Sequence, residues 1–528
     1  MRRSAGILLL AGFMVASCAT TLSPSPQPSV TPSASLSVNA SHSPSPAPAA
    51  TPAPTLPEST STPAPSVTPI STPFTGAAGW PLTAGGLSEP VFGSDGTAYL
   101  LVGWRDAEGE NRQSLVALDT AGYMKPGWPI EEPPGSHFGS PALGPDGSVY
   151  FEECENPAIG CVMHRLDATG REFPSWPFEV PPNLACSAGS SCFNRVIVGS
   201  NGTAHFGQWG SGGLQVIAID VSGEIVPGWP IALDAQGGSW SNAQVGSDGT
   251  LFILGVPDGS DGLASLAALA PDGRPRSGWP VYVPSESDYV LGPQGTVIVW
   301  SWIDRYGELC SAPRRTVFTV LGPDGRALPG WPRGSTGYAS SPVVQADGTV
   351  YYVSALGNIY AHDRAGEIKA GWPVAVPGAS VSCGPTSPYL APDGTLYVLT
   401  REVTALSSDG RPRPGWPYRP TDKLNLPCSP PGVDTDCWPS PAAPAFAPDD
   451  TVYIVVFRTD ATVVRAEVVA LDRQGQLKPG WPYRLPIDPT AGVVASLSVS
   501  PDGRLFVRGG YDTKSFLLAL DPDGRLSD

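Results

Sequence analysis

The stretch that decides the fold runs from Ser340 to Pro373 and reads SSPVVQADGTVYYVSALGNIYAHDRAGEIKAGWP. It holds a short apolar segment, an Asp-Gly turn at 347–348, a segment rich in aromatics at 349–353 and a second turn, Asp-x-x-Gly, at 363–366. Asp-Gly between apolar runs is a strong hairpin signal, because the turn needs a positive φ. The residues that lead into Gly-Trp-Pro add a fourth segment, so the unit predicts four short antiparallel strands.

The same unit recurs along the chain. Gly-Trp-Pro occurs eight times and Ser-Trp-Pro once, and together these nine copies have spacings of 41 to 65 residues. The nine tryptophans are Trp80, Trp128, Trp176, Trp229, Trp279, Trp331, Trp372, Trp416 and Trp481. Such a period indicates an array in which one unit cannot bury its own faces. We therefore expect these tryptophans to pack between neighbouring units, with Gly allowing close backbone approach and Pro on an outer edge strand.

Four antiparallel strands per repeat describe the blade of a β-propeller, so the expected fold is all-β. The first Gly-Trp-Pro, at 79–81, has no unit before it, and the last unit, which ends at Arg525, has no Gly-Trp-Pro after it. If the N-terminal strand pairs with the last unit, the two complete one blade and close the ring. This predicts nine blades over residues 76–528. Eight is the alternative, because the unit at 288–325 is the least regular.

The N-terminus has the pattern of an export signal. Arg2 and Arg3 precede an apolar run at 7–15, which is too short to span a bilayer, and Val15-Ala16-Ser17-Cys18 follows. That tetrapeptide resembles the bacterial lipobox, in which the cysteine thiol is lipidated. The resemblance implies a signal peptide at 1–17, lipidation of Cys18 and attachment to a membrane through acyl chains. We expect an extracytoplasmic protein on the cell membrane or the outer membrane; the type of envelope is left open.

Residues 18–75 are almost entirely Ser, Thr, Pro and Ala after the cysteine. Such a segment lacks the apolar residues to build a core and is expected to be a disordered spacer. The chain thus divides into a signal peptide at 1–17, a lipidated Cys18 with its linker to residue 75, and a propeller at 76–528.

Composition excludes one class of partner. The net charge is −17 with a pI near 4.7, so a nucleic-acid partner is not expected, because phosphate binding needs a basic face.

Eight cysteines remain besides Cys18, and an even number in an exported chain suggests disulfides. The candidate pairs are Cys154 with Cys161, Cys186 with Cys192, Cys428 with Cys437 and, across blades, Cys310 with Cys383.

The unit at 340–373 resembles the repeat of pyrroloquinoline-quinone-like propellers. The shared pattern is a strand, Asp-Gly-Thr-hydrophobic-Tyr, Gly-Asn-hydrophobic-Tyr-Ala, Asp-x-x-Gly and Trp, in nine imperfect copies over about 76–528. That superfamily includes quinoprotein dehydrogenases, the lipid-anchored propeller of outer-membrane protein assembly and many propellers of no known activity. The resemblance therefore implies a fold more than an activity. Gly-Trp-Pro in place of a lone Trp departs from the usual pattern.

The chemistry of the quinone enzymes cannot be placed on this sequence. Those enzymes often use an adjacent-cysteine ring, a calcium ion and a catalytic Asp, and this sequence has no adjacent cysteines. The nearest approach to a calcium loop, Asp521-Pro522-Asp523-Gly524, lacks a third carboxylate. The five histidines are scattered without metal-ligand spacing, and no P-loop, dinucleotide motif or Ser nucleophile elbow occurs. We expect no catalytic residue, no metal and no cofactor.

The departures from the repeat are the candidate contact residues. Trp438 lies in the largest insertion, at 418–444, beside Cys437, and a second insertion at 301–315 carries Trp302 and Arg305. Trp209 and Trp240 are further tryptophans outside the Gly-Trp-Pro set. Aromatic and Arg side chains on loops are typical of contact surfaces, although packing beneath loops is the alternative.

These features predict a lipid-anchored, extracytoplasmic, monomeric propeller that binds or scaffolds an envelope protein or glycan without being an enzyme. Two alternatives stay open. One is an enzyme, either a quinone-dependent dehydrogenase or a polysaccharide-active propeller. The other is a factor in envelope protein assembly, for which the argument is one of fold alone.

Overall fold

The computed structural model describes residues 79–105, 109–155, 160–181, 196–210, 213–233, 239–256, 263–303, 315–335, 337–381, 384–400, 402–419, 442–460, 463–486, 492–511 and 514–527. The signal peptide, Cys18 and the linker lie outside these ranges. Among the described residues, no helix is long and apolar enough to cross a membrane.

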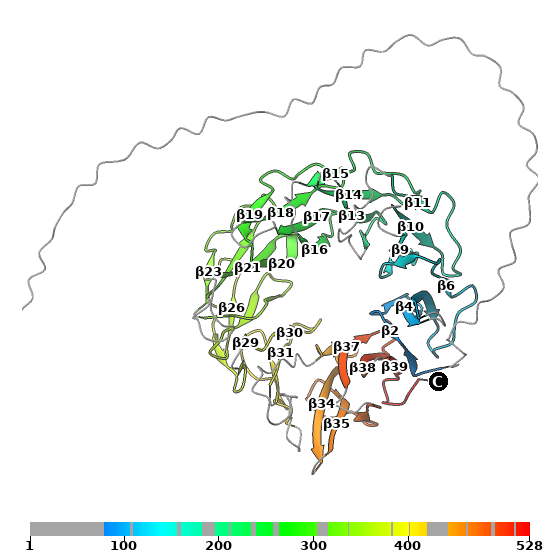
Figure 1. The fold of residues 1–528 in the computed structure, drawn as a ribbon. Helices are drawn as coiled ribbons and strands as arrows, with labels where there is room; N and C mark the ends of the chain where they lie inside the picture. Colours follow the sequence, from blue (N-terminus) through cyan, green and yellow to red (C-terminus); the bar gives the residue numbers. More distant parts are fainter. Residues whose placement is uncertain are drawn as a thin grey trace, which may run out of the picture. The chain divides into compact units, whose positions relative to one another are not determined.

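The described residues form nine antiparallel blades that follow one another round a ring in sequence order (Figure 1). The first blades are blade 1, β2 (Gly86–Leu87), β3 (Val91–Phe92), β4 (Ala98–Arg105), β5 (Asn111–Leu118) and β6 (Ile130–Glu131); blade 2, β7 (Ser136–Phe138), β8 (Ala142–Leu143), β9 (Val149–Glu155), β10 (Gly160–Leu166) and β11 (Phe178–Glu179); and blade 3, β12 (Ile197–Val198), β13 (Ala204–Gly210), β14 (Gly213–Ile219) and β15 (Ile231–Leu233). In blades 1 and 2 the inner strand is split into two segments.

The next three blades are blade 4, β16 (Ser239–Val245), β17 (Leu251–Val256), β18 (Leu263–Leu269) and β19 (Val281–Pro284); blade 5, β20 (Ser287–Leu291), β21 (Val297–Ile303), β22 (Arg315–Leu321) and β23 (Arg333–Gly334); and blade 6, β24 (Val343–Val344), β25 (Val350–Val353), β26 (Asn358–His362) and β27 (Val374–Ala375). The unit at 288–325 is therefore a full blade. Its turn is the short 3₁₀ segment η2 (Pro293–Gly295), where Gln294 takes the positive φ of 58°.

The last blades are blade 7, β30 (Pro388–Leu390), β31 (Leu396–Leu399) and β32 (Val403–Leu406); blade 8, β33 (Ala445–Phe446), β34 (Val452–Asp460), β35 (Val463–Leu471) and β36 (Tyr483–Arg484); and blade 9, β37 (Gly492–Val499), β38 (Leu505–Tyr511), β39 (Lys514–Leu520) and β1 (Leu82–Ala84). In blade 7 a bridge between Val403 and Tyr418 stands for the fourth strand. A small hairpin, β28 (Ser380–Val381) with β29 (Gly384–Pro385), precedes this blade.

The ring closes as the sequence predicts, with nine blades rather than eight. Strand β1 pairs antiparallel with β39, with Leu82 opposite Leu517, so the first strand completes the last blade. Blue β2 and β4 accordingly lie beside red β38 and β39 in Figure 1. Arg508 of blade 9 reinforces the seam, since its Nε donates to Glu89 Oε2 at 3.0 Å and its Nη1 to the Leu87 carbonyl at 3.2 Å.

The hydrophobic core lies between the blades rather than inside any one of them. In the described residues the buried apolar side chains form nine clusters, and each joins two consecutive blades. Alternate residues of one strand serve two clusters: Leu100 and Val102 of β4 face blade 9, whereas Tyr99 and Leu101 face blade 2. Strands buried on both faces explain why the middle of each unit reads as a nearly continuous apolar run.

Each of the nine repeat tryptophans crosses a boundary between blades. All are 6 or 7% exposed. Each indole Nε1 donates to a backbone carbonyl in the second turn of the following blade, at 3.0 to 3.4 Å. This turn is Asp-x-x-Gly in six blades and begins with Ala270, Gly322 or Ser407 in the other three. Trp80, for example, reaches the Thr120 carbonyl and joins blade 9 to blade 1. Trp-Pro is cis at all nine positions.

The glycine before seven of the nine tryptophans is required by contact as well as by conformation. Gly330 has a φ of +86°, and a Cβ there would overlap the Ala365 carbonyl oxygen in the next blade. The turn glycine Gly366 faces it, and a Cβ on Gly366 would lie only 2.6 Å from the Gly330 carbonyl oxygen. Two backbones therefore meet at these seven boundaries without room for a side chain. At the other two positions, a Cβ on Gly79 would lie 3.6 Å from its nearest neighbour, and Ser175 keeps a positive φ of 69°.

The free-energy cost of the steric overlap and that of the positive φ can be measured separately. Gly135 has a φ of +87° but nothing within 4 Å of a Cβ, so Gly135→Ala carries the conformational cost alone, about 1 to 2 kcal/mol. We expect Gly330→Ala to lower the free energy of unfolding by a further 1 to 3 kcal/mol, roughly, because the blades must move apart. Denaturant unfolding of the two variants and the parent checks this, and equal losses in both variants would contradict it.

Candidate functional site

The two ends of the blades differ in what they carry. Because the four strands of each blade alternate in direction, the Asp-Gly-Thr turns, the Asp-x-x-Gly turns and Gly-Trp-Pro all lie at one end, which we name the turn face. The hairpins between the second and third strands, and the connections from one blade to the next, lie at the other end, which we name the loop face. The loops that differ in length between units therefore gather on one side of the ring.

On the turn face, each Asp-Gly-Thr turn is held by its own carboxylate. Asp347 Oδ1 accepts the backbone N–H of Thr349 at 2.8 Å, and Lys369, two residues before the glycine of Gly-Trp-Pro, donates to Asp347 Oδ2 at 3.3 Å and to Thr349 Oγ1 at 3.0 Å. We name this set of Asp, Thr and cation a turn clamp. Four other blades have it, with the cations Lys125, Arg276, Arg413 and Lys478.

Hydrogen bonding sets the charge of these carboxylates. Burial would raise the pKa of Asp95, but hydrogen bonds from Lys125 and Thr97 overcome it and lower that pKa to about 2. The pKa values of Asp347, Asp393 and Asp449 are likewise lowered, with burial opposed by hydrogen bonds from the turn threonine and by the nearby cation. The clamp carboxylates are therefore ionised, and their charge is used within the fold.

Blades 3 and 5 lack both the turn carboxylate and the cation of the clamp. Blade 3 has Asn201 in the turn and Val226 at the cation position; blade 5 has Gln294 and Leu328. In blade 2, Phe173 occupies the cation position, and Arg165 replaces the cation from another strand. Its Nη2 donates to Asp146 Oδ2 at 2.6 Å, and its guanidinium lies 3.9 Å from the centre of the Phe173 ring. The turn Asp and the basic residue two positions before the glycine of Gly-Trp-Pro can therefore be recognised as a pair in the sequence. The Gly-Trp-Pro pattern alone does not reveal this pair.

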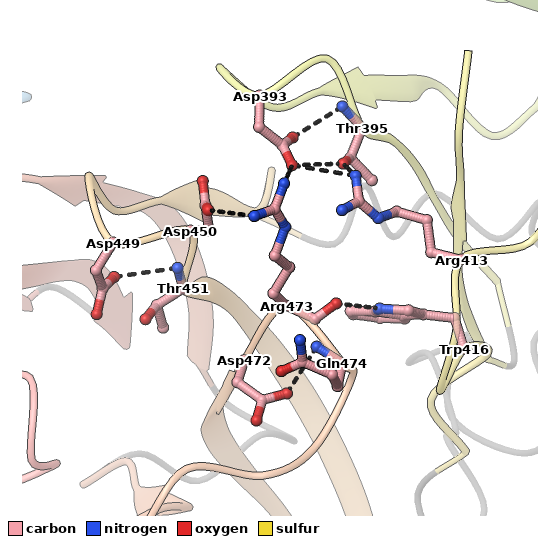
Figure 2. A network of polar contacts seen from close by, with 10 residues as sticks. All are labelled: Asp393, Thr395, Arg413, Trp416, Asp449, Asp450, Thr451, Asp472, Arg473 and Gln474. Carbon is pink, nitrogen blue, oxygen red and sulfur yellow. Dashed lines mark hydrogen bonds and ion pairs between the residues drawn. The ribbon is translucent and has the colours of Figure 1, made fainter.

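Figure 2 shows how a clamp is coupled to a tryptophan boundary. Arg473, in the Asp-x-x-Gly turn of blade 8, accepts the Trp416 indole N–H through its carbonyl at 3.1 Å. Its guanidinium lies 3.6 Å from Asp393 of blade 7 and 3.8 Å from Asp450 of its own blade. One residue thus joins two blades through both main chain and side chain, which identifies the turn face as the side of the ring where blades are tied together.

The loop face holds the tryptophans proposed as contact residues. The backbones of Trp209 in β13, Trp240 in β16 and Trp302 in β21 lie at the loop-face ends of three consecutive blades. The indole ring of Trp302 is half-buried and stacks on Tyr338, with ring centres 6.1 Å apart and planes at 6°. Its Nε1 is buried and has no hydrogen-bond partner in the described part of the chain.

An exposed leucine lies next to this pair. Ala355 N donates to the Tyr338 carbonyl at 2.7 Å, which places the hairpin 354–357 of blade 6 beside the ring pair. Leu356, at its tip, is 72% exposed, the highest value among the large exposed hydrophobic side chains described. Trp302, Tyr338 and Leu356 form an apolar group, which we name the blade 5–6 patch. Sequence reasoning identified Trp302 and missed Tyr338 and Leu356, because only the fold brings the three together.

The remaining candidate residues are distributed as follows. Cys154 and Cys161 form the expected disulfide, which joins directly opposite positions of β9 and β10. Asp521 Oδ1, in the turn nearest to a calcium loop, accepts hydrogen bonds from Arg504 and Ser527. The candidates outside the described residues are Cys18, Cys186, Cys192, Cys310, Cys383, Cys428, Cys437, Arg305 and Trp438.

The strand histidines lie at boundaries between blades. His205 is 4% exposed and burial lowers its pKa to about 4, so it is neutral. His362 is also buried, and its two nitrogens contact the Tyr352 hydroxyl and the Gly366 carbonyl. His164 differs, because it stacks on Phe151 and lies 3.1 Å from Glu153 and 3.0 Å from Glu172.

Comparisons with known proteins find similarity to solved structures alone. No family model and no curated protein matches the chain. The solved structures that resemble it include a eukaryotic initiation factor, at 12% identity and a TM-score of 0.48, covering 83% of this chain and 95% of that chain. BamB from Moraxella catarrhalis has 16% identity and a TM-score of 0.37, covering 72% and 90%. The Dos1 propeller has 10% identity and a TM-score of 0.37, covering 73% and 94%.

The turn clamp yields a first test. Lys369→Met leaves Asp347 without its cation, whereas Asp347→Asn combined with Lys369→Met reproduces the neutral condition of blades 3 and 5. We expect the double variant to be more stable than the sum of the two single losses implies, with a coupling of about 0.5 kcal/mol, since both groups are partly exposed. Denaturant unfolding of the four proteins measures the coupling. Strict additivity would contradict a stabilising interaction between Asp347 and Lys369.

The contacts of His164 with Glu153 and Glu172 yield a second test. Burial would lower the pKa of His164, but Glu153 and Glu172 raise it to about 9, from 6.5 in an unfolded chain. A raised pKa means stability that is complete below pH 6.5 and is lost as the pH rises through 9. Over this pH range, we expect the melting temperature of the parent to fall by more than the melting temperature of His164→Gln falls. His137→Gln is the control, because that side chain is 75% exposed; an unchanged slope in His164→Gln would refute the assignment.

Proposed function

We propose that this protein is a lipid-anchored, extracytoplasmic β-propeller of the pyrroloquinoline-quinone-like repeat type. In this proposal it binds an envelope protein or glycan and is not an enzyme. Cys18 carries the anchor, residues 19–75 act as the spacer, and the propeller presents its loop face to the partner. The support for the anchor is the lipobox pattern and the composition of the linker.

One observation carries the proposal, the blade 5–6 patch on the loop face. Trp302 and Tyr338 offer parallel aromatic rings, and Leu356 adds an exposed apolar side chain beside them. Aromatic rings favour both apolar protein side chains and the C–H faces of sugars, and buried aromatic anchors supply much of the energy of protein interfaces. The turn face also has exposed apolar side chains, Tyr123, Val221, Ile368 and Leu477, but each belongs to a different blade. The clamp carboxylates on that face are engaged in hydrogen bonds with the turns and the clamp cations.

Site-specific photo-cross-linking tests which face binds. The full chain is produced in its own host with p-benzoylphenylalanine at Leu356 on the loop face or at Arg411 on the turn face, whose side chain is 85% exposed. We expect an adduct after irradiation at Leu356 and none at Arg411. Trp302→Ala, added to the Leu356 probe, is expected to reduce the adduct at least tenfold. Protease or glycosidase treatment then identifies the class of partner.

Two controls complete this experiment. Cys18→Ser is expected to move the protein from the membrane fraction to the soluble fraction, which tests the anchor independently of binding. Equal adducts at both probes, or none at Leu356, would contradict loop-face binding. A rise in melting temperature with pyrroloquinoline quinone plus Ca²⁺, and not with Ca²⁺ alone, would contradict the non-enzymatic part of the proposal.

A further inference from the structure

Blade 2 brings two cysteines and a carboxylate into one place. Cys154 in β9 and Cys161 in β10 are directly opposite each other, and their side chains therefore lie on the same face of the sheet. Glu152 is two residues before Cys154, which places it on that face as well. One carboxylate oxygen of Glu152 and both sulfurs lie within 4.8 Å of one another.

Two of these three residues are buried, and the third is partly accessible to solvent. Glu152 is 3% exposed and Cys161 is 4% exposed, at the boundary with blade 3, whereas Cys154 is only partly buried. His137 of β7 is directly opposite Cys154 on the other side of β9, and its side chain is 75% exposed. A reductant can therefore attack from the Cys154 side. The His137 imidazole itself lies 3.4 Å from Glu132 through its Nδ1.

Charge favours a cation at this blade. Residues 131–179 contain nine Asp and Glu against two Arg, a net charge of −7 within a chain of −17. Zn²⁺ binds thiolate sulfur at about 2.3 Å and carboxylate oxygen at about 2.1 Å, so tetrahedral ligand atoms are about 3.5 to 3.8 Å apart. To reach that spacing, the two sulfurs must move apart once their bond is broken, and the Glu152 oxygen, which lies within 4.8 Å of both, must approach them by up to about 1 Å.

We propose that Cys154 and Cys161 are a reducible pair whose dithiol form, together with Glu152, binds a thiophilic divalent cation such as Zn²⁺. A dithiol reductant passes two electrons and two protons to the disulfide and is itself oxidised to a disulfide, which leaves two free thiols. Metal binding then displaces one proton from each thiol. In the oxidised state the sulfurs are bonded to each other, so the site is closed.

Cobalt is the probe for this site, because Co²⁺ bound to thiolates in a tetrahedral site shows intense charge-transfer and visible bands. The full chain carrying Cys18→Ser is reduced with dithiothreitol, desalted without oxygen and titrated with Co²⁺. We expect one equivalent with thiolate bands in the reduced protein, and loss of that equivalent in Cys154→Ser/Cys161→Ser. Cys186→Ser/Cys192→Ser is the matched control and should retain it.

Glu152→Gln separates ligation from folding, since this variant keeps both cysteines. It should retain thiolate bands but bind Co²⁺ at least tenfold more weakly, and it should form the disulfide on reoxidation. Circular dichroism verifies that each variant is folded. Bands and stoichiometry in Cys154→Ser/Cys161→Ser equal to those of the reduced parent would overturn the proposal, as would the absence of thiolate bands from the reduced parent.

Discussion

The hydrogen bond from each tryptophan indole to a carbonyl of the next blade is the contact on which the ring depends. A four-stranded blade has two apolar faces and no interior of its own, so its stability comes from its neighbours. The tryptophan supplies a large buried ring, and its Nε1 fixes the distance between consecutive turns. At seven of the nine boundaries the glycine before the tryptophan leaves no room for a Cβ, so the two backbones meet directly there.

Each unit has two turns, and in blade 6 an Asp side chain fixes both of them. In the turn that presents its carbonyl to Trp331, Asp363 Oδ1 accepts the backbone N–H of Glu367 at 2.9 Å. In the Asp-Gly-Thr turn of the clamp, Asp347 accepts a backbone N–H two residues on. The carboxylate then needs a counterion, which the strand before Gly-Trp-Pro provides in five blades. Blades 3 and 5 reach the same turn with an amide and an apolar residue. An amide needs no counterion, so the loss of one charge permits the loss of the other.

The sequence predicts the ring well because its evidence is local and repeated. Asp-Gly turns, the Gly-Trp-Pro period and the unmatched ends are enough to place nine blades and their closure, as the pairing of β1 with β39 confirms. The loop-face patch could not be found in that way. Trp302, Tyr338 and Leu356 come from three segments of two blades, and nothing in the period of the repeat sets their distances. The position of Glu152 beside two sulfurs depends on strand register, which only the structure supplies.

The division between the two faces explains how such a ring can acquire function without losing stability. Turn-face residues contact the next blade at every boundary, so a substitution there alters the packing of two blades. A longer loop between the second and third strands costs little, because loop-closure entropy rises only slowly with length. The described strands β21 and β22, which flank the insertion at 301–315 in the sequence, end and begin at the loop face. Recognition placed on the loop face therefore varies independently of the contacts that hold the ring, which is the physical reason to look for the partner there.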